Sequence, residues 1–82
     1  MADLNAEAAT EAYAFTLTRR ELEKATAKFP PFHSAHEGYA ILLEEVRELE
    51  HEVFHGSRER QTAEAVQVAA MAIRFLKDIC NI

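Results

Sequence analysis

The positions of the residues that interrupt helices constrain the fold of this 82-residue chain more than any other feature. Pro30-Pro31 separates a first segment from a second, and Gly56 separates the second from a third. Within the segments apolar residues recur at helical spacing, and no alternating pattern typical of strands is present. The chain is therefore predicted to be a single all-α domain over residues 1–82, with three main helices in an antiparallel array.

The expected helix boundaries follow from capping residues. A first helix is predicted over about 5–28, because the two prolines end it. Ser34 opens a capping box, which starts a second helix that runs to about residue 54. Ser57 then caps a third helix over about 58–79. The three helices account for most of the sequence.

The second helix has an apolar side and an acidic side when residues are placed ~100° apart around its axis. Five glutamates share the acidic side, and Ile41 lies among them. The core side is predicted to contain Leu42, Val46, Leu49 and Val53, with Tyr39, Leu43 and Phe54 at its margin. Phe15 and Phe32 are also expected in the core, as most aromatic residues are.

The third helix is apolar around most of its circumference, and its polar strip is narrow. That strip contains Gln67, Arg74, Lys77 and Asp78, and solvated surface is the expected place for Arg74 and Lys77. A helix of this kind must be covered on several sides, which two other helices cannot do. We therefore expect homo-oligomerisation, into a dimer or a tetramer, to complete the bundle.

Charge and composition exclude several classes of partner and location. The net charge is −5 and the basic residues are scattered, which argues against nucleic acid or an anionic membrane as the partner. The sequence has no signal peptide and no membrane-spanning apolar run, so a cytoplasmic location is expected. The single cysteine excludes an internal disulfide and a cysteine-rich zinc module.

Four glutamates are the main candidates for a functional site. Glu44, Glu45 and Glu48 lie on the second helix, where residues three and four apart are neighbours, and Glu64 lies on the third. Helices packed side by side can bring these carboxylates to one point, where a hard cation would neutralise them. On spacing alone, an acidic face that is simply solvated is the more common explanation.

The pattern Glu44-Glu45-x-x-Glu48, followed on the next helix by Glu64, resembles the MazG-like nucleotide pyrophosphohydrolases. These all-α enzymes have an EExxE motif followed on the next helix by ExxD. The resemblance implies that Glu45, Glu48 and Glu64 bind Mg²⁺ or Mn²⁺ and that Glu44 supports them or positions the attacking water. Gln67 stands where the family has Asp, so an amide oxygen would complete the ligand set.

The activity that the resemblance implies is hydrolysis of a nucleoside triphosphate to its monophosphate and pyrophosphate. Two alternatives stay open. Because Gln67 carries no negative charge, the chain can instead be a catalytically weakened nucleotide-binding protein or a structural helical oligomer. His51-Glu52-x-x-His55 also fits the zinc metallopeptidase signature, although two histidines need a third ligand.

Overall fold

The structure is a computed structural model that describes residues 10–82. Three helices and the short segments between them make up this part of the chain. The helices are α2 (Glu11–Lys28), α3 (Ala35–His55) and α4 (Arg58–Asp78), and no strand occurs within these residues. The all-α class and the three-helix organisation predicted from the sequence are confirmed. The predicted start of the first helix, near residue 5, lies outside the described residues.

Hydroxyl side chains begin all three helices, as expected for N-caps. Thr10 accepts a hydrogen bond from the Tyr13 N–H, and the Ser57 hydroxyl accepts one from Arg60 at 3.2 Å. Ser34 accepts one from the Glu37 N–H at 3.1 Å. The Glu37 carboxylate in turn accepts a bond from the His33 N–H rather than from Ser34, so the capping box reaches back one residue further than in its usual form.

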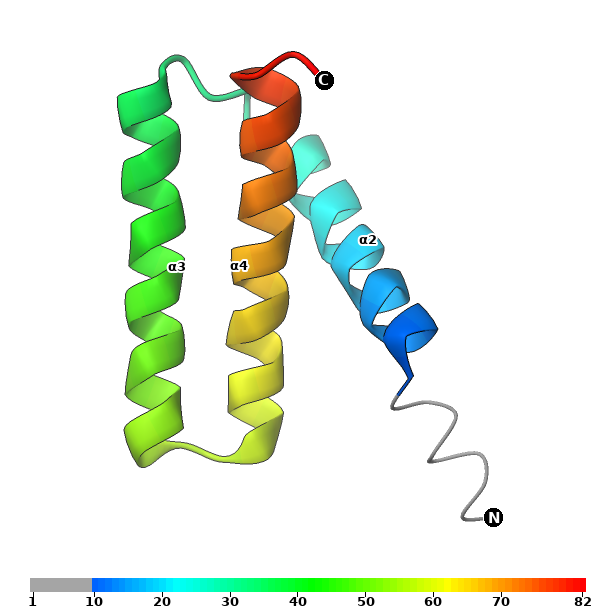
Figure 1. The fold of residues 1–82 in the computed structure, drawn as a ribbon, viewed down its shortest axis with the longest axis vertical. Helices are drawn as coiled ribbons and strands as arrows, with labels where there is room; N and C mark the ends of the chain where they lie inside the picture. Colours follow the sequence, from blue (N-terminus) through cyan, green and yellow to red (C-terminus); the bar gives the residue numbers. More distant parts are fainter. Residues whose placement is uncertain (1–9) are drawn as a thin grey trace.

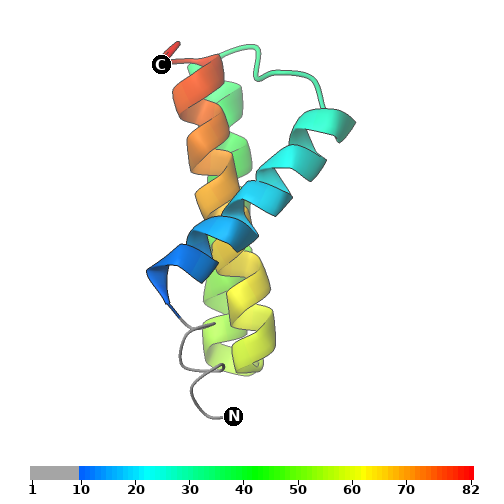
Figure 2. The ribbon, with the colours of Figure 1, turned by 90° about the vertical axis from the view of Figure 1, so that its right-hand side faces the viewer.

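The long helix α4 lies in the middle of the array. It packs against α3 along an antiparallel hairpin and against α2 on another side, whereas the backbones of α2 and α3 do not approach each other (Figure 1). Figure 2 shows that α2 crosses α4 obliquely, so only the α3–α4 pair has the antiparallel arrangement expected for all three helices. No helix in the described part of the chain is long and apolar enough to cross a membrane.

A small core fills the junction of the three helices. Its buried apolar members are Ala25, Phe32, Ala70 and Met71, and Leu22, Leu42, Phe75 and Ile79 pack against them. Gly38 brings α3 close to α4 here, because a Cβ on this residue would lie 2.8 Å from the Phe75 ring. The core therefore depends on close approach of the helices as much as on large side chains.

Arg74 is buried, which corrects its expected place on the solvated surface. Its guanidinium donates to the Pro30 carbonyl at 2.6 Å and lies 4.4 Å from the centre of the Phe32 ring. Asp78 pairs with Arg74 at 3.9 Å and accepts the Phe32 N–H at 3.1 Å. The polar strip of α4 thus fastens the segment between α2 and α3, because a buried charge needs such partners.

Several residues expected in the core are exposed instead. Val46, Val53 and Tyr39 on α3 are 41%, 55% and 60% exposed, and Phe15 on α2 is 67% exposed. Among the aromatic residues singled out from the sequence, Phe32 is buried as predicted. The periodicity of α3 identifies its apolar side correctly, but α4 is too narrow to cover that whole side.

Candidate metal centre

Three of the predicted ligands converge where α3 and α4 run side by side. Carboxylate oxygens of Glu45, Glu48 and Glu64 all lie within 4.8 Å of one another. Glu45 and Glu48 are three residues apart on α3 and therefore point from the same side of the helix. Glu64 comes from the first half of α4, which the antiparallel hairpin places beside them. These three side chains are not splayed apart as on a simple solvated face.

Burial and repulsion between the carboxylates make the ionised forms of Glu45 and Glu64 less favourable than usual. Burial, followed by a hydrogen bond and charge repulsion from Glu48, raises the pKa of Glu45 to about 7. Burial, followed by repulsion from Glu48 and Glu52, also raises the pKa of Glu64 above its usual range. A carboxylate with no cation nearby responds in this way when like charges surround it. Binding of a divalent cation would remove the repulsion.

The separation of the oxygens suits a small hard cation. Oxygen ligands lie ~2.1 Å from Mg²⁺, so neighbouring ligand oxygens are ~3 Å apart and opposite ones ~4.2 Å apart. Oxygens within 4.8 Å of one another reach that spacing through small side-chain rotations. The donor set, three carboxylates and no nitrogen or sulfur, is the kind that Mg²⁺ and Mn²⁺ prefer.

A cavity of about 960 Å³ opens beside the carboxylates, between α2, the segment before α3, and the facing sides of α3 and α4. Three of the predicted site residues, Glu44, Glu45 and Gln67, line this cavity. Its volume is in the range of cavities that hold cofactor-sized ligands. A second cavity, of about 490 Å³, touches Glu44, Glu48 and Glu64 from another side.

The walls of the larger cavity include residues that the sequence did not indicate. Lys24 and Lys28 on α2, with Phe29 after it, bring two cations and an aromatic ring to a space that also touches acidic residues. Their contribution depends on how α2 crosses α4, which no local pattern reveals. Figure 2 shows the oblique crossing of α2 over α4, and residues at the end of α2 line the cavity together with residues of α3.

The histidine pair of the zinc signature lies at the end of α3. The His51 and His55 rings are 4.9 Å apart and both residues are exposed. Within residues 10–82, the group of glutamates described above is the one set of three or more His, Cys, Asp or Glu residues placed to share an ion, and it includes neither histidine. The structure therefore supplies no third ligand for a zinc site at this pair.

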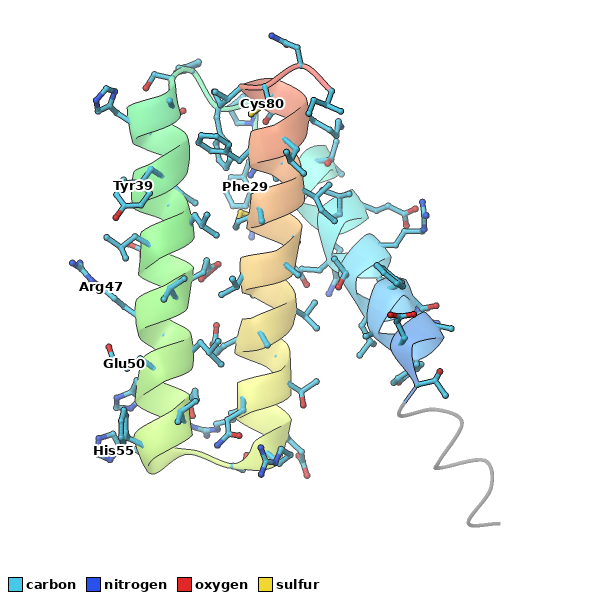
Figure 3. All side chains as sticks on the ribbon, in the orientation of Figure 1. Phe29, Tyr39, Arg47, Glu50, His55 and Cys80 are labelled. Atoms are coloured by element: carbon cyan, nitrogen blue, oxygen red, sulfur yellow. The ribbon has the colours of Figure 1, made fainter. Side chains whose placement is uncertain are left out.

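Figure 3 shows Arg47 and Glu50 on the side of α3 that faces away from α4, so not every charged residue of the EExxE region belongs to the cluster. Glu50 in particular offers a matched control, since it is an exposed glutamate on the same helix. Comparison of the chain with models of protein families, with curated proteins and with solved structures finds no match.

Proposed function

We propose that the chain is a cytoplasmic, MazG-like nucleoside triphosphate pyrophosphohydrolase that depends on Mg²⁺ or Mn²⁺. The observation that carries the proposal is the convergence of Glu45, Glu48 and Glu64 next to a ligand-sized cavity. An acidic cluster does not by itself identify a ligand. A cluster beside a cavity that also contains lysines suits a ligand that is itself a polyanion, such as a polyphosphate.

In this proposal the two ends of the substrate have different surroundings. Glu45, Glu48 and Glu64 would hold the divalent cation at the phosphate end, and Lys24 and Lys28 would neutralise negative charge of the phosphates from the α2 side of the cavity. The base and sugar occupy the part of the cavity near Phe29, Ile41 and Met71, which is apolar. Phe29 is exposed, and the Lys28 ammonium lies 5.4 Å from the centre of its ring, so the opposite ring face is the one that can stack on a base.

The reaction needs a water molecule to attack one of the two phosphorus atoms, α or β, that share the bridging oxygen, while the bond from that phosphorus to the bridging oxygen breaks. The electron pair of that bond leaves with the bridging oxygen, which gives the nucleoside monophosphate and pyrophosphate. The bound cation supplies neutralisation of the phosphate charge and a lowered pKa of the attacking water. Glu44 touches both cavities and is exposed, so it is placed to accept the proton that the water loses.

The second candidate is a nucleotide-binding or structural protein without turnover, and Gln67 favours it. This residue lines the cavity beside Glu44 and Glu45 but contributes no negative charge. With three carboxylates around the ion instead of four, the charge available to hold a second cation is smaller. The enzyme and the nucleotide-binding protein differ in turnover and agree in binding.

The test is release of pyrophosphate by the purified chain with Mg²⁺, and separately with Mn²⁺, from a panel of canonical and modified nucleoside triphosphates. We expect release with at least one nucleotide, its loss in Glu48→Gln, and its retention in Glu50→Gln. Absence of pyrophosphate with every nucleotide, in a protein that still binds Mg²⁺ by calorimetry, would refute the enzyme and leave the binding protein.

A further inference from the structure

The last two turns of α3 carry a pair of histidines that the proposed function does not use. His51 and His55 are four residues apart on this helix, so their side chains leave it on the same side, one turn apart. Their ring centres are 4.9 Å apart, the ring planes are tilted by 42°, and both residues are exposed. The pair is therefore open to a ligand from solvent.

The separation of the two rings is the one that a shared metal ion requires. An imidazole nitrogen binds Zn²⁺ at ~2.0–2.1 Å, and the ring centre lies ~1.1 Å behind that nitrogen, so each centre is ~3.2 Å from the ion. Two such centres are ~4.5 Å apart when the nitrogen–metal–nitrogen angle is ~90°, and ~5.2 Å apart at the tetrahedral angle. The observed 4.9 Å lies between these limits. Rotation of each ring about its last side-chain bond, which is a soft torsion, then aims one nitrogen at the ion.

The backbone that carries the pair is held in place. The Glu52 carbonyl accepts a hydrogen bond from the Gly56 N–H at 2.9 Å and another from the Gln61 side chain at 3.1 Å. These two bonds close the last turn of α3 and tie it to α4. The spacing of the histidines is thus set before an ion arrives, and less conformational entropy is lost on binding.

The surroundings of the pair favour a cation. The pair lies at the C-terminal end of α3, where the helix dipole places about half a negative charge. Figure 3 shows His55 on the side of α3 that faces away from α4. His51 shares the smaller cavity with four glutamates and one arginine, which are Glu44, Glu48, Glu52, Glu64 and Arg47. Negative charge therefore predominates on the side of His51 that faces this cavity.

The donor atoms of the pair select a different class of ion from the carboxylates. Imidazole nitrogens suit borderline transition-metal ions such as Zn²⁺, Ni²⁺ and Cu²⁺, whereas Mg²⁺ prefers oxygen. The cluster of Glu45, Glu48 and Glu64 offers oxygen alone. Because the pair supplies two protein ligands, water completes the coordination of its ion, which distinguishes it from a catalytic zinc centre with three protein ligands.

We propose that His51 and His55 together bind one borderline divalent transition-metal ion, at a site separate from the carboxylate cluster. The ion joins successive turns of α3, so it binds when those turns are helical and stabilises the end of the helix by mass action. The second ring binds an ion that the first already holds, so the pair exceeds a single imidazole in affinity. With two protein ligands instead of the four of a structural site, the expected dissociation constant for Zn²⁺ is on the order of 10 µM.

Titration of the full chain with Zn²⁺, followed by calorimetry and by NMR of the imidazole nitrogens, tests the site. Cys80→Ser is the background, because it removes the exposed thiol, and excess Mg²⁺ is present to compete for the carboxylates. We expect one equivalent of Zn²⁺ to shift the signals of both rings together. His51→Ala and His55→Ala should each weaken binding at least about tenfold. His36→Ala is the matched control, because it removes another exposed histidine of α3, and it should leave the affinity unchanged.

Four results of this titration would overturn the proposal. They are absence of zinc binding, a shift of one ring without the other, equal weakening by His36→Ala, and loss of binding in Glu48→Gln with retention in His51→Ala. The last result would place the zinc ion on the carboxylate cluster. Because no readout depends on turnover, the result is independent of whether the chain hydrolyses nucleotides.

Hydrogen exchange tests the effect of the ion on the helix. Zn²⁺ at about one hundred times its dissociation constant should slow the exchange of amides in the last turn of α3 by up to about 100-fold, where exchange requires that turn to open. The same concentration of Zn²⁺ should leave these rates unchanged in His51→Ala. Equal slowing in the wild type and in His51→Ala would show that the ion does not join the two histidines.

Discussion

Affinity for Mg²⁺ should rise steeply with pH around neutrality, because a proton and the cation compete for Glu45. Burial and the neighbouring Glu48 raise the pKa of the Glu45 carboxyl to about 7. The metal requires the ionised form, so the apparent dissociation constant is multiplied by one plus the ratio of protonated to ionised Glu45.

The magnitude follows from that pKa. At pH 6 about one Glu45 in eleven is ionised, whereas at pH 8 about ten in eleven are, which makes binding about tenfold tighter at pH 8. A tenfold change corresponds to about 1.4 kcal/mol of binding free energy. The raised pKa of Glu64 acts in the same direction and steepens the dependence. At pH 7 each cation bound should release about half a proton from Glu45.

Calorimetric titration with Mg²⁺ at pH 6, 7 and 8 measures this dependence, and buffers of different ionisation enthalpy count the protons released. Glu48→Gln should weaken binding and also flatten the pH dependence, since it removes the hydrogen bond and the repulsion that help to raise the pKa of Glu45. Glu50→Gln should change neither quantity. An affinity that is constant from pH 6 to pH 8, or a Glu48→Gln profile as steep as that of the wild type, would refute the reasoning.

Two further predictions concern Gln67 in the site and the contact between α3 and α4. Gln67→Asp should tighten Mg²⁺ binding about tenfold in the same titration, because it adds a carboxylate beside Glu44 and Glu45; unchanged affinity would place Gln67 outside the coordination shell. Gly38→Ala should destabilise the fold by about 1 kcal/mol in chemical denaturation, because crowding against Phe75 and Phe32 costs about 1–3 kcal/mol and the gain in helix propensity returns only about 1. Stabilisation by Gly38→Ala would mean that these rings have room to move aside.

Local patterns predicted the helices well because local physics determines them. Ser34 and Ser57 accept hydrogen bonds from the N–H groups three residues ahead, as their spacing indicated. The prolines exclude helix between α2 and α3 for an equally local reason. The end of α3 at His55 and of α4 at Asp78 each differ by one residue from the predicted ends, which is within the usual fraying of a last turn.

Part of the candidate site could also be predicted from the sequence. Spacing on one helix places Glu45 beside Glu48, and a tight hairpin brings the first turns of α4 level with the second half of α3, so Glu64 follows. Arg74 could not be predicted in the same way. Its place depends on the path of the segment before α3, which supplies the Pro30 carbonyl as a partner, and no periodicity encodes that path.

The larger cavity could not be predicted from the sequence either, because it depends on the angle at which α2 crosses α4. Val46 and Val53 also show what a sequence pattern cannot predict. Their apolar stripe indicates that something covers this side of α3, but not which chain supplies the cover. Helical periodicity reports the faces of each helix, whereas crossing angles are decided by packing between them.

The attachment of α2 to the rest of the chain has a consequence for its motion. This helix packs on α4 but not on α3, and the segment that follows it is fastened by Arg74 and Asp78. Backbone amides of α2 should therefore exchange with deuterium sooner than those of the α3–α4 pair, through openings that leave the pair intact. Such opening would widen the cavity beside the glutamates from the α2 side, because residues at the end of α2 line it.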